Sequence, residues 1–308
     1  MKKIGDRERQ SNRRSVGREP GPERQVVRRT VRTRPVTVRP ERAALDRQPQ
    51  QEPPRRREPL ERPRSYGSYR GSLISKEPYR EPPLTYRHEL KYYINFRDYM
   101  VLRQCLKGLM KPDPHSGRNG SYHIRSLYFD DMDESALLDK LSGTGRRGKY
   151  RVRIYGLSSK VIRFEKKIKE GQYIAKKSFS LTQEEYYDLI QGRANFLLAK
   201  REPLAKEVWL KIVNGRLSPR IVVDYEREAY VMDYESVRIT FDKNLKSGRP
   251  GDIFDSQLPV VPISQKGIIV LEIKFNKALP DYIRNVLGNM DGPQRSSISK
   301  YVLCRKYD

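Results

Sequence analysis

The sequence predicts an α+β fold with an antiparallel β-barrel of about eight strands, and three observations support this prediction. Segments with alternating polar and apolar side chains recur from residue 86 onward. Segments in which apolar side chains have helical spacing lie between them. Most connections are short and contain residues that favour turns.

Residues 148–155 show the strand pattern most clearly, and their polar face is cationic. Successive side chains of a strand point to opposite faces, so Lys149, Arg151 and Arg153 share one face. The same alternation recurs in residues 163–169 and 270–275. A single strand of this kind is most often a half-solvated edge. Several of them, wrapped with their polar faces inward, would enclose a charged cavity that requires a polyanion.

Composition favours a soluble protein with a polyanionic partner. The chain has 308 residues and a formal net charge of +26, which indicates nucleic acid, phosphates or an anionic membrane surface as partner. Two cysteines form neither a disulfide framework nor a metal motif, which favours a cytoplasmic location. No apolar run reaches the ~18 residues of a membrane span. A position at the inner face of a membrane stays open.

Residues 1–85 differ from the rest of the chain. They hold 23 Lys and Arg against 11 Asp and Glu, and they are rich in proline without any apolar periodicity. Such a segment buries too little surface to offset its ordering entropy, so we expect a disordered tail. Two interpretations remain, a solubilising extension and a flexible tether for nucleic acid, polyphosphate or anionic lipid.

The first half of the predicted domain, residues 86–308, contains five strands and two helices. A strand over 86–94 precedes a helix that Asn95 caps, in which Cys105 is expected to be buried. The remaining elements are strands over 122–130, 148–155, 161–169 and 176–181, and a short helix over 135–141.

The second half alternates helices and strands. Thr182 and Glu185 match a capping box and open a helix to about residue 191, which a second helix over 202–213 follows. The expected strands cover 220–226, 229–234, 237–242 and 268–275, with a long loop over 248–267. A helix over 280–290 and residues 296–301 complete the domain.

Ten basic residues could bind a chain of phosphoryl groups. Arginine presents a planar fork to phosphate oxygens and lysine a point charge. Each residue alone is most often a solvated surface charge, and only their shared strand parity favours a site. The set is Lys91, Arg125, Arg151, Arg153, Lys167, Lys177, Arg227, Arg238, Lys274 and Lys300.

Carboxylates among these cations have two interpretations, as counter-ions or as ligands of Mg²⁺ or Mn²⁺. Glu272 is the preferred ligand because it shares a strand face with Lys274. For Glu165 both interpretations stay open. No Walker-type loop is present, and the GxGxxG pattern at 143–148 precedes a strand instead of a helix. Any catalysis would therefore depend on positioning and charge neutralisation.

Several spaced motifs resemble the VTC domain, the polyphosphate polymerase domain of the vacuolar transporter chaperone complex and its bacterial relatives. This family lies within the triphosphate tunnel metalloenzyme (CYTH-like) superfamily. The similarity covers residues 86–308. The motifs lie at Glu89–Tyr92, Arg125–Asp130, Tyr150–Arg153, Phe164–Lys167, Arg220–Arg227, Leu271–Phe275 and Ser299–Tyr301.

The resemblance implies a closed eight-stranded barrel whose interior is a basic tunnel. It also implies transfer of the γ-phosphate of ATP to a growing polyphosphate chain with a divalent metal, Mn²⁺ or Mg²⁺. Glu272 would bind that metal. We expect catalytic roles for Lys91, Arg151, Arg153, Lys167 and Lys300. Phosphate contacts are expected from Arg125, Lys177, Tyr225, Arg227, Arg238, Lys274 and Ser299.

One departure from the superfamily favours the polymerase branch. Hydrolase and cyclase members carry ExExK on the first strand, whereas this chain has Arg87 in place of the first glutamate. The nearest alternative is a metal-dependent triphosphatase, in which water is the acceptor. A non-catalytic module that binds polyphosphate or RNA is the second alternative. An anionic membrane or a membrane-protein partner also stays open.

Overall fold

The computed structural model describes residues 79–263, 267–288 and 296–306. All of them belong to one compact unit. The tail predicted for residues 1–85 lies outside the described residues as far as residue 78. Residues 79–85 form no helix or strand and are exposed.

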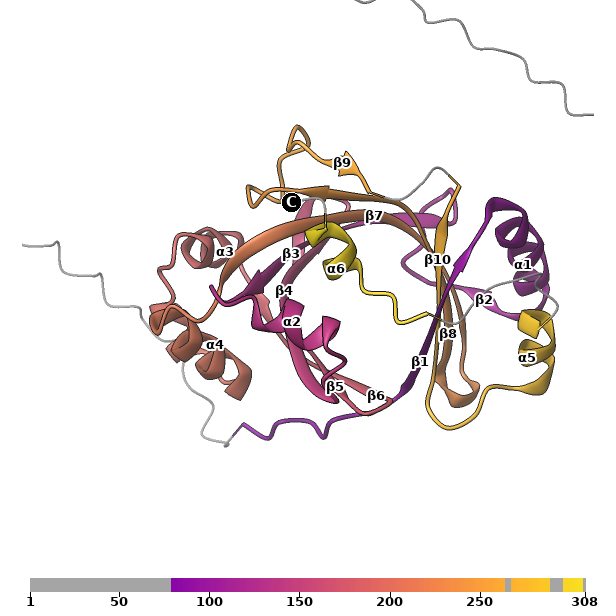
Figure 1. Ribbon diagram of the computed structural model, residues 1–308, viewed down its shortest axis with the longest axis horizontal. Coiled ribbons are helices and arrows are strands. Elements are labelled where there is room, and N and C mark those ends of the chain that lie inside the picture. The colour runs from indigo at the N-terminus through magenta and orange to yellow at the C-terminus, as the bar shows by residue number, and fades with distance from the viewer. Residues whose placement is uncertain (1–78, 264–266, 289–295, 307–308) are drawn as a thin grey trace, which may run out of the picture. The chain divides into compact units, whose positions relative to one another are not determined.

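One antiparallel sheet dominates the fold, as the alternation predicts (Figure 1). Eight of its strands follow the order β1-β10-β8-β7-β3-β4-β5-β6, while β2 pairs with β7 and β9 pairs with β8. The strands are β1 (His88–Ile94), β2 (Lys111–Pro112), β3 (Ser121–Asp130), β4 (Arg146–Tyr155), β5 (Ser158–Glu170), β6 (Tyr173–Leu181), β7 (Ser218–Met232), β8 (Val237–Gly248), β9 (Val261–Pro262) and β10 (Ile269–Phe275).

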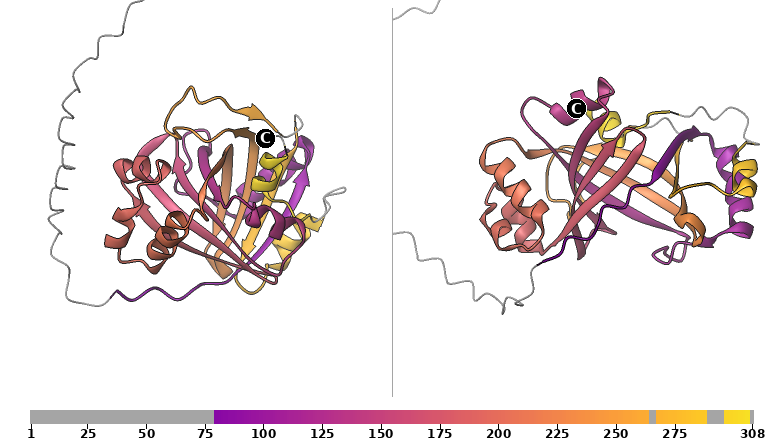
Figure 2. Two further views of the ribbon diagram at one scale, coloured as in Figure 1. Left: turned by 60° about the vertical axis from the view of Figure 1, so that its left-hand side comes forward. Right: turned by 90° about the horizontal axis from the view of Figure 1, so that it is seen from below.

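The sheet is curved but does not close into the predicted eight-stranded barrel (Figures 1 and 2). Its edge strands β1 and β6 are linked by a single bridge in which the Arg87 and Ile174 backbones exchange hydrogen bonds of 3.1 and 3.0 Å. Pro82 and Pro83 precede this bridge and have no N–H to donate to a ladder. In the other direction, β6 begins at Tyr173, just after the turn at Gly171. The described residues show no further pairing between β1 and β6.

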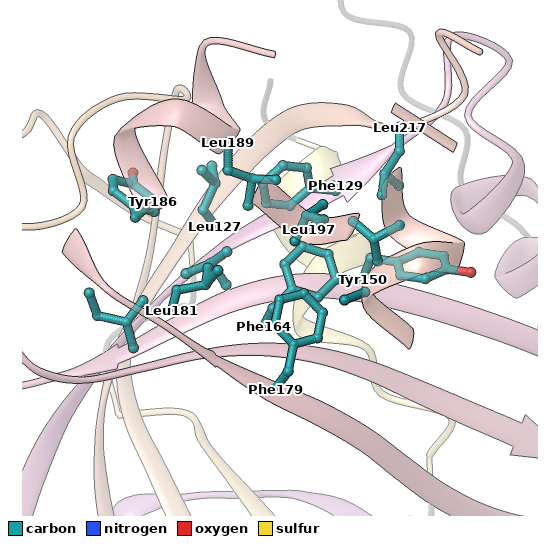
Figure 3. Close-up of a cluster of buried hydrophobic side chains, with 14 of the residues drawn as sticks. Leu127, Phe129, Tyr150, Phe164, Phe179, Leu181, Tyr186, Leu189, Leu197 and Leu217 are labelled. Atoms are coloured by element: carbon teal, nitrogen blue, oxygen red, sulfur yellow. The ribbon is translucent and has the colours of Figure 1, made fainter. Parts of the chain in front are cut away.

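Two α-helices and a 3₁₀ helix pack against the largest apolar core of the described residues. The α-helices α3 (Gln183–Ile190) and α4 (Pro203–Val213) and the 3₁₀ helix η1 (Asn195–Ala199) contribute to a cluster built on β3, β4, β5 and β6. Figure 3 shows side chains of this cluster, with the Phe164 and Phe179 rings stacked 5.1 Å apart between centroids. The capping box of α3 is confirmed, since Thr182 and Glu185 exchange hydrogen bonds. The 3₁₀ helix was not predicted.

Two other helices cover the β1, β10 and β8 strands. They are α1 (Phe96–Leu109), which Asn95 caps as expected, and α5 (Asp281–Gly288). Both contribute to a second apolar cluster with these strands. Cys105 is exposed on α1, so its predicted burial is wrong: the buried side of the helix is formed by Tyr99, Leu102 and Leu106.

A third cluster joins α6 (Lys300–Arg305) to β3, β7 and β8, with α2 (Ser135–Leu141) nearby. In it the Tyr301 ring stacks on Tyr128, with 5.3 Å between centroids. The predicted strands at 220–226 and 229–234 are one strand, β7. The prediction left Arg227 and Glu228 outside both strands, but both side chains are buried: Arg227 donates to Asp242 of β8, and Glu228 accepts a hydrogen bond from Tyr99 of α1.

Candidate functional site

The inner face of the curved sheet borders a cavity of about 1150 Å³. Alternate residues of the strands line it, as strand geometry requires. On β4 these are Lys149, Arg151 and Arg153, and on β5 Glu165 and Lys167. Residues 296–300, which lead into α6, form another part of the wall.

Positive charge dominates this cavity. Among the described residues, fifteen Lys and Arg side chains line it against three Glu. The carboxylates are Glu89, Glu165 and Glu272. The cations are Arg87, Lys91, Lys140, Arg147, Lys149, Arg151, Arg153, Arg163, Lys167, Lys169, Lys176, Arg227, Arg238, Lys274 and Lys300. An anionic ligand would offset a large electrostatic cost of bringing these cations together.

Most residues predicted for the site meet in this cavity. Strands β1, β4, β5, β7, β8 and β10 and the segment before α6 bring them together from distant parts of the chain. They are Lys91, Arg151, Arg153, Glu165, Lys167, Tyr225, Arg227, Arg238, Glu272, Lys274, Ser299 and Lys300.

Arg125 and Lys177, both predicted to contact phosphate, do not line the cavity. The Arg125 guanidinium donates to Asp224 at 2.7 Å and to the Asp255 carbonyl at 2.6 Å, so it holds the 249–260 loop to the sheet. Lys177 forms an ion pair with Glu81 at 2.9 Å. Each shares strand parity with apolar core residues, Arg125 with Leu127 and Lys177 with Phe179, and therefore points away from the cavity.

The same parity identifies cavity residues that the prediction omitted. Lys176 is on the face of β6 opposite to Phe179, and Lys149 shares the face of Arg151. Lys149 was recognised on the cationic face of its strand but was not assigned to the site. Applying the alternation to every basic strand would have selected both.

A carboxylate shared by four cations lies on β10. Glu272 is 2.9 Å from the amines of Lys274 and Lys300, 3.2 Å from Lys91 and 3.4 Å from Arg227. Although burial opposes ionisation, these cations hold the pKa of Glu272 well below its ordinary value. Glu272 is therefore a permanent negative charge within the cationic wall.

Two further carboxylates are shared in the same way. Asp242 accepts two hydrogen bonds from Arg227, at 2.6 and 2.8 Å, and pairs with Lys300. Glu89 is 2.9 Å from Lys91 and 2.8 Å from Lys167. Neighbouring cations keep the pKa of both carboxyl groups below the ordinary value despite burial.

On the opposite wall, the Glu165 carboxylate accepts hydrogen bonds from side chains of β4 and β6. Arg151 donates to it from two nitrogens, at 2.8 and 2.6 Å, and Lys176 donates at 2.7 Å. Arg153 is directed instead by Ser126 and by the hydroxyl of Tyr225, each at 3.1 Å. These contacts fix the two guanidinium groups on one wall of the cavity.

Three lysines have too little counter-charge for their burial. Burial lowers the pKa of Lys149 to about 6, and the nearby cations Lys91 and Lys167 contribute. Burial also lowers the pKa of Lys167 to about 7 and that of Lys274 to about 8, against the opposing effect of nearby glutamates. A polyanion in the cavity would restore the protonated form of all three.

The donor set around Glu272 fits a metal ion only if phosphate oxygens complete the coordination. Within the described residues, no group of three or more His, Cys, Asp or Glu side chains could hold a metal ion. Mg²⁺ commonly binds through one or two carboxylates together with substrate phosphates. Glu272 and Glu165 are the two carboxylates predicted for that role, and both already accept hydrogen bonds from cations of the cavity, Glu272 from Lys274 and Lys300 and Glu165 from Arg151 and Lys176.

None of the helices that the structure describes is both long and apolar enough to cross a membrane.

Comparison with known proteins identifies a family. A family model for the VTC domain matches residues 86–307. A search of curated proteins found no match.

Several solved structures are distantly similar. One is a proposed adenylyl cyclase from Hippeastrum that is described with a dominant triphosphatase activity, with 11% identity over 72% of this chain and 96% of that one and a TM-score of 0.44. A protein from Pyrococcus horikoshii is 12% identical over 72% and 99% of the two chains, with a TM-score of 0.40. A proposed adenylate cyclase from Bacillus halodurans is 16% identical over 67% and 87%, with a TM-score of 0.39.

Proposed function

Because the chain belongs to the VTC domain family, we propose that it is a polyphosphate polymerase that transfers the γ-phosphate of ATP to a growing polyphosphate chain. The observation that carries this proposal is the cavity in which fifteen cations face three carboxylates. A linear polyanion matches such a wall along its length. Residues 86–308 form the domain that we assign to this activity, with ATP and polyphosphate as its ligands.

The arginines would orient the phosphoryl groups. Arg151 and Arg153 are held on one wall by Glu165, Ser126 and Tyr225, so their forks are arranged before a ligand enters. Such preorganised donors lower a phosphoryl-transfer barrier because no further reorganisation is needed during the reaction.

The lysines of the opposite wall would stabilise the charge on the leaving diphosphate. Lys91 and Lys300 remain protonated, because Glu272 with Glu89 or Asp242 raises the pKa of each amine despite burial. Lys167 and Lys274 gain protons as anionic groups approach. Arg227, Arg238, Tyr225 and Ser299 complete the phosphate contacts that we assign to the cavity.

A divalent ion, Mg²⁺ or Mn²⁺, would be held by Glu272 together with phosphate oxygens, and it would supply neutralisation of the transferred group's charge. Glu165 is assigned as a counter-ion for the arginines. The basic residues 1–85 would act as a tether for polyanions at a cytoplasmic site.

The test is incubation of the purified full-length chain with ATP and Mn²⁺ or Mg²⁺, followed by gel analysis of the product. We expect long polyphosphate chains and release of ADP. Free phosphate without polymer would identify a triphosphatase, and binding of polyphosphate without turnover would identify a non-catalytic module. Arg153→Ala should abolish both binding and polymer formation, and Lys177→Ala, which changes a lysine outside the cavity, is the matched control.

A further inference from the structure

Three tyrosine hydroxyls in the cavity accept hydrogen bonds from arginines, and all six side chains line the cavity. The pairs are Arg151 with Tyr128 at 2.9 Å, Arg153 with Tyr225 at 3.1 Å and Arg238 with Tyr122 at 2.9 Å. A guanidinium group donates hydrogen bonds but does not accept them. In each pair the hydroxyl oxygen is therefore the acceptor, and the hydroxyl proton is directed elsewhere.

A buried tyrosine outside the cavity shows both sides of such a hydroxyl in use. The Tyr99 hydroxyl accepts from the Lys243 amine at 3.1 Å and donates to the Glu228 carboxylate at 2.6 Å. The three cavity tyrosines also accept from a cation, but the part of the chain that the structure describes provides no acceptor for their protons. By analogy with Tyr99, we expect an anionic ligand to accept them.

The surroundings of Tyr128 fix the position of its hydroxyl. Its ring stacks on Tyr301, with 5.3 Å between centroids, and only 8% of its surface is exposed. Its partner Arg151 is itself held by two hydrogen bonds to Glu165, at 2.8 and 2.6 Å. The hydroxyl therefore lies beside a fixed guanidinium group in the cavity, where its proton is available to a phosphate oxygen.

Tyr122 is arranged in the same way at another part of the wall. Arg238, which donates to its hydroxyl, also forms an ion pair with Asp113. Burial raises the pKa of Tyr122 above its ordinary value, so the hydroxyl keeps its proton at neutral pH. Tyr122 and Tyr128 share one face of β3, about 20 Å apart along the strand. A ligand must contain several phosphoryl groups to contact both.

We propose that Tyr122 and Tyr128 are phosphate-binding residues, which donate their hydroxyl protons to phosphate oxygens of one linear polyanion while an arginine holds each hydroxyl in place. The inference rests on the proposed function for the identity of the ligand, but it requires binding and no turnover. Tyr225, already assigned to phosphate contacts, is paired in register with Ile124 and so lies between the two. The three hydroxyls form a row of uncharged donors among the cations.

Salt dependence distinguishes a hydroxyl that contacts phosphate from one that only positions its arginine. Each cation that contacts phosphate adds about one to the slope of log affinity against log salt, whereas a neutral hydroxyl adds nothing. Tyr128→Phe removes the hydroxyl and keeps the ring that stacks on Tyr301. Direct donation predicts a lower affinity with an unchanged slope. A positioning role predicts a lower slope as well, because Arg151 would lose its phosphate contact.

Two further variants provide matched controls. Tyr99→Phe also removes a hydroxyl that contacts a cation, but the acceptor of that hydroxyl is Glu228 in the protein. Its polyphosphate affinity should change by less than about twofold. Lys176→Ala removes one charge from the cavity wall and should lower the salt slope by about one.

The experiment is an anisotropy titration of the full-length protein with labelled long-chain polyphosphate over a salt series, with inorganic triphosphate and ATP as competitors. We expect about tenfold weaker binding of the long chain in Tyr122→Phe and in Tyr128→Phe, with unchanged slopes. Triphosphate and ATP are too short to reach both tyrosines, so no more than one of the two substitutions should weaken each. Thermal unfolding curves establish that the variants are folded.

Three results would overturn the inference: unchanged long-chain affinity in either cavity tyrosine variant, a slope lowered by about one in Tyr128→Phe, or an equal loss of affinity in Tyr99→Phe. The polymerase assignment is tested separately by the ATP assay. If that assay yields no polymer, the assignment fails, while the titrations still decide whether these hydroxyls bind phosphate.

Discussion

At the scale of single residues, the charge of Lys149 should depend on what the cavity holds. Its pKa of about 6 means that at pH 8 the amine is neutral in the empty site. Bound polyphosphate favours the ammonium form, so binding should take up protons at pH 8, and much less uptake is expected from Lys149 at pH 5.5. Titration calorimetry in buffers of different ionisation enthalpy measures this uptake. Lys149→Met should lower the uptake at pH 8 by about one proton.

The same group affects the stability of the ligand-free protein. Because the folded-state pKa of Lys149 lies below its unfolded value, the unfolded chain binds more protons between these two values, and stability rises with pH from about 6 to about 10. Lys149→Met should reduce this rise. An unchanged pH dependence of both binding and unfolding would contradict the depressed pKa.

Glu272 is predicted to be essential for the stability of the protein when the cavity holds no ligand. Glu272→Gln removes the charge that Lys91, Lys274, Lys300 and Arg227 share. The free energy of unfolding should fall by about 3 kcal/mol or more, as when a buried ion pair loses one partner. Urea unfolding measures this loss.

Added polyphosphate should recover part of that loss, because its phosphates replace the missing negative charge. The control is the exposed residue Glu226 on β7, where Glu226→Gln should change stability by less than about 0.5 kcal/mol. Equal effects of the two variants would show that Glu272 does not hold the cations together.

A substitution at Arg125 distinguishes the phosphate contact predicted from the sequence from the structural role seen in the fold, where Arg125 holds the 249–260 loop to the sheet. It joins Asp224 to the Ile253 and Asp255 carbonyls, outside the cavity. Arg125→Met should therefore lower the free energy of unfolding by about 1–3 kcal/mol and change polyphosphate affinity less than about twofold. Urea unfolding and fluorescence anisotropy with labelled polyphosphate test the two statements. A large loss of affinity in a stably folded variant would restore Arg125 to the site.

At the scale of elements, neighbouring lysines on β6 should behave differently. Lys176 lines the cavity and contacts Glu165, whereas Lys177 lies on the other face and pairs with Glu81. Lys176→Ala should weaken polyphosphate binding about tenfold or more, the worth of one charge-assisted hydrogen bond. Lys177→Ala is the control and should bind nearly as the wild type does. Equal affinities of the two variants would contradict the assigned strand parity.

Helices and strands were predictable where the pattern is local. Asn95 and the Thr182–Glu185 capping box begin their helices as expected, because a cap needs only residues within one turn. The division of β7 into two strands was wrong because the partners of Arg227 and Glu228 come from other elements. A charged pair indicates a loop only when nothing distant neutralises it.

At the scale of the whole molecule, the basic N-terminal segment should add affinity without being required for catalysis. Removal of residues 1–78 should weaken polyphosphate binding at low salt, because the segment holds an excess of arginine. The difference from the full-length chain should vanish near about 1 M salt, where screening is nearly complete. Anisotropy titrations over a salt series and the ATP assay test this. Loss of turnover in the shortened protein would show that the segment contributes to the reaction.

The sequence by itself predicted a polyanionic ligand and placed most of the cavity wall on the polar faces of strands. Strand periodicity is local, so alternation alone decides that Arg151, Arg153, Lys167 and Lys274 share the polar faces of their strands. Tertiary structure decided that these faces meet around one cavity while the sheet stays open between β1 and β6. It also decided that Ser299 reaches Lys149, 150 residues away in the chain. Such contacts depend on register and on the path of the segment before α6, which long-range packing sets and no local pattern encodes.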